Sequence, residues 1–126
     1  MDEKYLEWFT QSYYDFDTAK YMHKGGRYIY TIFMCHLSIE KALKGLFQYK
    51  SETVPPKTHN LIFFIEELKL EPDETILKFI IRLNQLNIFS RYPEDLQKVK
   101  DFYNKNYSKA LLENTEKVLQ WIKKLL

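Results

Sequence analysis

Three polar side chains spaced four residues apart could do chemistry on one predicted helix. His36, Glu40 and Lys44 recur with the period of an α-helix, so their side chains line up on a single face. Glu40 and Lys44 stand in the order that favours an ion pair along a helix. Two interpretations remain open. One is a surface ion pair beside a hydrogen-bonded histidine. The other is a polar groove, with Lys41 beside it, that meets a phosphate or a protein partner.

A second imidazole follows a proline-rich stretch. His59 comes directly after the sequence Pro55–Thr58 and at the expected start of a helix. Free backbone N–H groups and the helix dipole favour an anion at such a position. The alternative is that Thr58 or His59 only caps the helix.

A guanidinium and an aromatic ring lie together in the sequence Ser90–Arg91–Tyr92–Pro93. The planar fork of Arg91 suits a phosphate or a carboxylate, and the ring of Tyr92 could stack on a base or fill a gap in packing. The alternative is that Arg91 pairs with Glu94 or Asp95 and stiffens a loop.

Other chemistries find little support in the sequence. His36 and Glu40 have no neighbour that completes a metal-ligand set, and three glycines cannot build a glycine-rich phosphate loop. Cys35 stands in mid-helix among apolar residues, a setting that keeps a thiol inert. We therefore expect neither a metal nor a cofactor.

The elements that must position these residues are helices. Apolar side chains recur every three or four positions, as is typical of amphipathic helices, while three glycines and four prolines are too few for a sandwich or barrel. The expected helices cover residues 3–24, 27–50, a short stretch at 61–68, a fourth from about 73 that ends near 90, and about 104–126. We predict an all-α fold, an antiparallel up-and-down four-helix bundle with an additional short helix.

Two further expectations concern the packing of the last helix and the role of the tyrosines. Its predicted inner face includes Tyr107, Leu111, Asn114, Val118, Trp121 and Leu125, so Trp121→Ala should cost about 3–5 kcal/mol. Several tyrosines lie partly off the inner faces, and tyrosine suits interfaces, which favours a homodimer. They are Tyr13, Tyr14, Tyr28, Tyr30 and Tyr103.

Composition limits the class of protein. The chain has 126 residues, enough for one domain over 1–126, with 45% apolar and 29% charged residues as in soluble globular proteins. A single cysteine forms no intrachain disulfide, which points to a reducing, cytoplasmic compartment. The acidic, aromatic N-terminus is unlike a signal peptide, and no apolar run approaches the roughly 20 residues that span a bilayer. The net charge of +2 neither predicts nor excludes nucleic-acid binding.

Four sequence pieces, in this order, resemble the HEPN domain family over nearly the whole chain. They are Asp15, Phe16 and Ala19; the stretch His36–Lys44, like the family's Glu–Lys–Ala–x–Lys; Pro55–Leu61, like its Pro–x–Thr–His–x–Leu; and Ser90–Pro93, like its Arg–Tyr–Pro.

The resemblance implies a bundle of four main helices that usually forms a homodimer. Many such proteins are encoded beside a minimal nucleotidyltransferase and form a toxin–antitoxin pair with it. Members that cleave RNA use an arginine and, about four to six residues later, a histidine near the dimer interface. Arg91 would be that arginine, but the matching positions, Leu96–Lys98, contain no histidine.

Two classes of function follow. In the preferred one, Arg91, Tyr92, His59 and the face formed by His36, Glu40, Lys41 and Lys44 bind a nucleotide, RNA or the nucleotidyltransferase without catalysis. In the alternative, the protein is a metal-independent ribonuclease toxin in which Arg91 stabilises charge and His59 moves a proton. A purely structural dimerisation domain is a third possibility.

Overall fold

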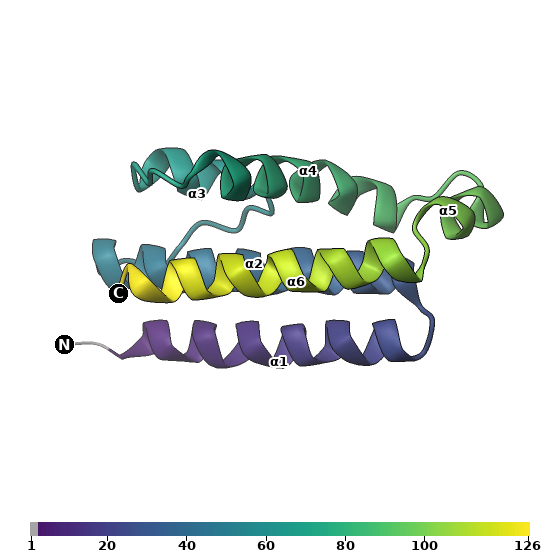
Figure 1. Cartoon of the computed structure of the whole chain (residues 1–126). Helices are drawn as coiled ribbons and strands as arrows, with labels where there is room; N and C mark the ends of the chain where they lie inside the picture. The colour runs from purple at the N-terminus through teal and green to yellow at the C-terminus, as the bar shows by residue number, and fades with distance from the viewer. Residues whose placement is uncertain (1–2) are drawn as a thin grey trace.

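Helices make up all the regular structure in the part of the chain that the computed structural model describes, residues 3–126. Four are long and two are short (Figure 1). In chain order they are α1 (Lys4–Lys24), α2 (Tyr28–Ser51), α3 (Leu61–Glu67), α4 (Glu74–Arg91), α5 (Leu96–Phe102) and α6 (Lys105–Lys124).

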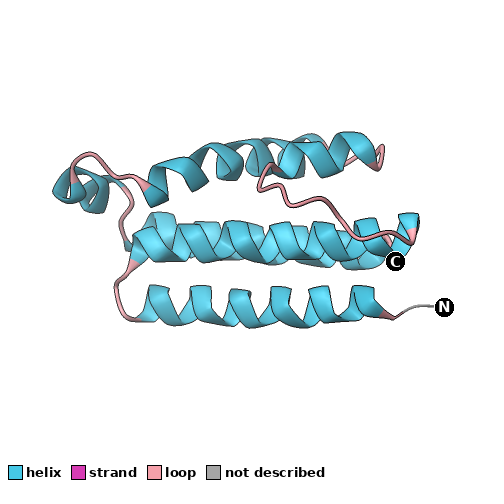
Figure 2. Ribbon diagram, turned by 180° about the vertical axis from the view of Figure 1, so that it is seen from behind, coloured by secondary structure: helices cyan, strands magenta, loops and turns pink. Residues whose placement is uncertain are grey.

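The long helices form three layers. α2 and α6 lie side by side in the middle, α1 covers one side, and α3 with α4 covers the other (Figures 1 and 2). Successive long helices run in opposite directions, so the predicted all-α antiparallel bundle is confirmed. The second short helix, α5, was not predicted, because Val99 is its only buried residue and seven residues show little periodicity.

Side-chain caps set where four helices begin. Asn60, Asp73, Asp95 and Asn104 each accept a backbone N–H of the helix that follows, at 2.9 to 3.2 Å. The cap of α3 is therefore Asn60, and the alternative that Thr58 or His59 caps this helix is wrong.

α2 is the central helix and contacts every other helix of the described chain. Its buried side chains, among them Ile32, Ile39 and Leu43, lie on several sides, as its continuous apolar character predicts. A glycine lets α1 approach it closely. A Cβ at Gly45 would lie 2.7 Å from the ring of Phe9, so a larger residue would push the two helices apart.

The structure refines one expectation about large side chains and corrects another. The buried face of α6 centres on Leu111, Val118 and Ile122, which leaves Trp121 only partly buried against the core. Tyr103 is buried, and its ring lies 4.8 Å from that of Tyr107, so it does not belong with the exposed tyrosines. Tyr13, Tyr14 and Tyr30 are exposed as expected.

Over residues 3–126, none of the helices is long and apolar enough to cross a bilayer.

Candidate functional site

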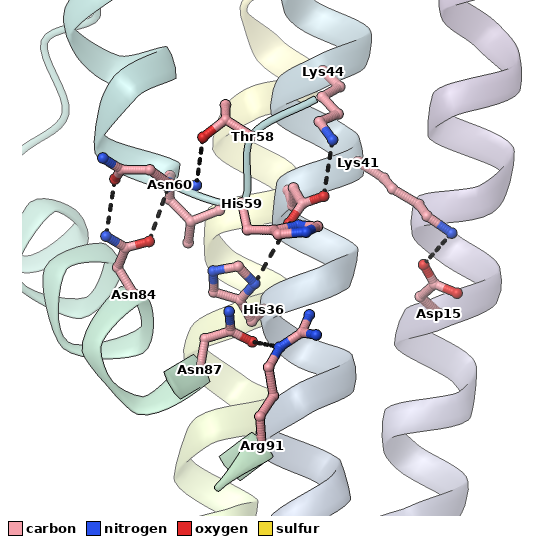
Figure 3. Close-up of polar contacts among 12 residues, drawn as sticks. Asp15, His36, Lys41, Lys44, Thr58, His59, Asn60, Asn84, Asn87 and Arg91 are labelled. Atoms are coloured by element: carbon pink, nitrogen blue, oxygen red, sulfur yellow. Dashed lines mark hydrogen bonds and ion pairs between the residues drawn. The ribbon is translucent and has the colours of Figure 1, made fainter. Parts of the chain in front are cut away.

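Glu40 lies at the centre of a polar cluster, which we call the Glu40 cluster. It comprises the buried His36, Glu40 and Lys44 of α2 and the exposed His59 of the segment before α3 (Figure 3). The Nζ of Lys44 donates to one carboxylate oxygen at 3.0 Å. The other oxygen lies 2.9 Å from Nδ1 of His59 and 3.8 Å from Nδ1 of His36. The side chains of Glu40 and Lys44 are only 3% and 9% exposed, so the interpretation as a surface ion pair is wrong.

His36 is fully enclosed between α2 and its neighbours. Burial lowers the pKa of its imidazole to about 4, although the Glu40 carboxylate acts in the opposite direction. The ring is therefore neutral at pH 7. Because the ring is almost completely shielded from solvent, His36 can contact Glu40 but not a ligand in solution.

His59 differs from His36 in its exposure. Its side chain is 62% exposed while Glu40 fixes Nδ1. A carboxylate at Nδ1 favours a ring that carries a proton on Nδ1 and donates it to Glu40, and Nε2 is left free for another partner. The segment that carries His59 is held by Asn84, whose amide bonds both the Asn60 side chain and the Leu61 N–H at 3.0 Å. Sequence reasoning missed Asn84.

Both lysines of the predicted binding face have carboxylate partners. Lys41 lies 2.9 Å from Asp15 and so joins α2 to α1, and Lys44 bonds Glu40 beside the ring of Trp8. A phosphate would have to compete with a carboxylate for either ammonium group.

Arg91 ends α4 and has no carboxylate partner among residues 3–126. Its Nε donates to Asn87 at 3.5 Å, and its guanidinium lies 4.6 Å from the ring centroid of Phe33. The alternative of a pair with Glu94 or Asp95 is wrong. The positive charge of Arg91 adds a minor contribution to the lowered pKa of His36, and Figure 3 draws the side chains of Arg91 and His59 beside that ring.

A cavity of about 640 Å³ opens beside this guanidinium, and we call it the Arg91 cavity. The α1–α2 turn, the first turns of α2, the end of α4 and α5 form its walls. Among residues 3–126, its charged lining residues are Arg27, Arg91 and Lys100, and neither Asp nor Glu lines it. Its aromatic lining residues are Tyr28, Tyr30, Phe33, Tyr92 and Tyr103. Burial raises the pKa of the Tyr103 phenol, so its ring is neutral.

Sequence reasoning found Arg91 and Tyr92 but missed Arg27, Lys100 and Phe33. These residues are far apart in the chain, and Lys100 lies on the short helix that the periodicity did not reveal. The only signal was compositional, a basic residue directly after Gly25–Gly26.

Cys35, the single cysteine of the chain, is buried in α2. Burial raises the pKa of the Cys35 thiol to about 12, so the prediction that it is inert is supported. Within the described residues, no group of three His, Cys, Asp or Glu side chains could hold a metal ion.

Comparisons with known proteins agree with the fold. The model of a family described as the HEPN domain matches residues 5–125, whereas no curated protein matches. TT1696 from Thermus thermophilus superposes with a TM-score of 0.83 and 18% identity, covering 99% of this chain and 100% of that one. ST0689, described as an archaeal HEPN homologue, gives 0.77 and 22%, covering 98% of each chain.

Proposed function

Because the chain belongs to the HEPN domain family, we propose that it is a non-catalytic module that binds a nucleotide or RNA through Arg91 and Tyr92. The observation that carries the proposal is the guanidinium of Arg91, which has no carboxylate partner among residues 3–126 and lies at the edge of a cavity that no acidic residue of this range lines. Phe33 and Asn87 hold this guanidinium in place, so little side-chain freedom is lost when it binds.

The chemistry of the site suits a phosphate beside a base. Arginine donates two parallel hydrogen bonds to a phosphate, and such charge-assisted bonds are about twice as strong as neutral ones. Tyr92 is 75% exposed beside it, and an exposed ring offers a platform on which any base can stack. His59 adds a further donor or acceptor on the same side of α2.

Binding measurements with single variants test the proposal. A labelled adenine nucleotide and a short labelled RNA are titrated with wild type, Arg91→Ala and Lys123→Ala. Lys123, an exposed residue in the last turn of α6, serves as the matched control. The C-terminal end of α6 lies at the opposite end of the bundle from α5 (Figure 1). Arg91→Ala should weaken binding about tenfold or more, as expected for a lost charged hydrogen bond. Unchanged binding of every probe to Arg91→Ala would show that the assigned site is wrong.

The family resemblance also leads us to propose a protein partner, a minimal nucleotidyltransferase encoded nearby, with which this chain would form a toxin–antitoxin pair. The exposed Tyr13 and Tyr14, which do not line the Arg91 cavity, support a homodimer. Co-expression with the product of the adjacent reading frame should yield a complex that survives gel filtration. Sedimentation of the chain alone at micromolar concentration should show a dimer, and a strict monomer would contradict it.

A ribonuclease is the second candidate, and one observation favours it. Glu40 orients the exposed imidazole of His59 on the side of α2 where Arg91 lies. An imidazole backed by a carboxylate can move a proton while a guanidinium stabilises charge on phosphate.

The two candidates differ in a cleavage assay. RNA is incubated with a chelator and wild type, Arg91→Ala or His59→Ala. If the protein is a ribonuclease, wild type cleaves the RNA and both variants do not. If it is a binding module, none of the three proteins cleaves the RNA. Equal cleavage by all three would identify a contaminating nuclease.

A further inference from the structure

Three cationic side chains from three separate elements meet in the Arg91 cavity. Arg27 comes from the α1–α2 turn, Arg91 from the end of α4 and Lys100 from α5. In the described range 3–126, no acidic side chain lines this cavity and none of the three cations is in an ion pair. The cavity therefore has a net positive charge that no carboxylate of the described chain neutralises.

Arg27, Arg91 and Lys100 are all exposed, unlike the two lysines of α2 that have carboxylate partners. Lys41 and Lys44, which are less exposed, each have a carboxylate at 2.9 and 3.0 Å, respectively. Like charges that share one cavity repel each other, and a polyvalent anion relieves the repulsion. Three cations in one cavity match a ligand that carries several negative charges close together.

The aromatic residues that line the cavity suit a planar ring as the other part of such a ligand. Tyr30 and Tyr92 are 57% and 75% exposed and line the same cavity, so their rings are available for stacking. The volume of about 640 Å³ lies in the usual range of small-molecule sites. A planar heterocycle and a short chain of phosphates would use both kinds of lining.

We infer that the Arg91 cavity selects a nucleoside di- or triphosphate over a ligand with a single phosphate, with Arg27 and Lys100 binding the additional phosphates. A single phosphate offers fewer negative charges and fewer oxygens to the three cations than consecutive phosphates do, so consecutive phosphates can form more charge-assisted hydrogen bonds. In an RNA strand, sugars separate the phosphates, so a strand concentrates less charge in one cavity. This inference rests on the proposed function, because Arg91 belongs to both.

A titration series tests the inference. AMP, ADP, ATP and a 5′-hydroxyl RNA oligonucleotide are titrated at constant ionic strength into wild type, Arg27→Ala, Lys100→Ala and the control Lys123→Ala. The series is run in EDTA and repeated with Mg²⁺, and circular dichroism confirms that each variant is folded. The side chains of Arg27 and Lys100 make no ion pair in the described chain, so alanine should leave the fold intact.

Wild type should bind ATP about tenfold or more tightly than AMP, the gain expected from one or two further charged hydrogen bonds. Arg27→Ala and Lys100→Ala should each lose most of this gain while AMP affinity changes by less than about threefold. Inorganic triphosphate should compete with ATP, and Lys123→Ala should match wild type.

Other results separate the two proposals. Equal affinity of wild type for AMP and ATP, with both weakened by Arg91→Ala, overturns the selectivity and leaves the proposed function standing. Losses in Arg27→Ala and Lys100→Ala no larger than in Lys123→Ala also overturn it, as does RNA binding as tight as that of ATP. A wild-type protein that binds no nucleotide and no RNA overturns both proposals.

Discussion

Replacement of Glu40 by glutamine should destabilise the protein strongly, because the change strands a buried ammonium group. Glu40 and Lys44 are 3% and 9% exposed and lie 3.0 Å apart. Gln keeps the size of the side chain and removes its charge. Breaking a buried ion pair from one side typically costs about 3–5 kcal/mol. In a domain of this length that loss lowers Tm by about 10–20 °C.

An exposed ion pair on α4 provides the matched control. Glu74 and Lys78 have the same four-residue spacing and lie even closer, at 2.8 Å, but their side chains are 79% and 73% exposed. Glu74→Gln should therefore change the free energy of unfolding by less than about 1 kcal/mol. Burial, and not distance, accounts for the expected difference.

Urea and thermal unfolding at pH 7, followed by circular dichroism at one protein concentration, measure both variants. The double variant Glu40→Gln with Lys44→Met removes the stranded charge and should recover about 1–3 kcal/mol of the loss. The reasoning is refuted if Glu40→Gln costs no more than Glu74→Gln. It is also refuted if removal of Lys44 recovers nothing.

Three further predictions concern pH, packing and the core. Burial lowers the pKa of His36 from 6.5 to about 4, so the unfolded chain takes up this proton first as the pH falls. The contribution of His36 is complete above pH 6.5 and is lost progressively towards pH 4, by up to about 3 kcal/mol. The difference between urea unfolding curves of wild type and His36→Gln across this range measures it, and a difference independent of pH would contradict it. Gly45→Ala should cost about 1–3 kcal/mol through overpacking between α1 and α2, whereas Gly25→Ala, with only ordinary contacts, should stay within about 0.5 kcal/mol. Equal melting temperatures of these two variants would count against the close helix contact. Ile122→Ala should cost about 2–5 kcal/mol and Trp121→Ala less, because only Ile122 is fully buried. The reverse order in chemical unfolding would show that Trp121 carries more of the core.

The sequence by itself determines the helices and much of their order. Spacing of apolar residues, Gly25–Gly26 and the cap residues Asp73 and Asn104 act within a few residues of chain, so they can be read locally. The alignment of His36, Glu40 and Lys44 on one helical face follows from the same local geometry. The sequence did not predict α5, because a helix of seven residues is too short for the 3.6-residue spacing of apolar side chains to be recognised.

The tertiary structure alone decides which face of each helix is buried and which distant residues meet. Periodicity places Glu40 and Lys44 together, but only the packing of α1, α3 and α4 around α2 removes them from water and adds His59. A sequence pattern resolves the direction of a helix face only to about one residue, which is why it points to Trp121 where the structure buries Ile122. Arg27, Arg91 and Lys100 come together because the α1–α2 turn and α5 lie at the same end of the bundle. No local interaction encodes that meeting, since it depends on how the apolar faces of helices distant in sequence pack to exclude water.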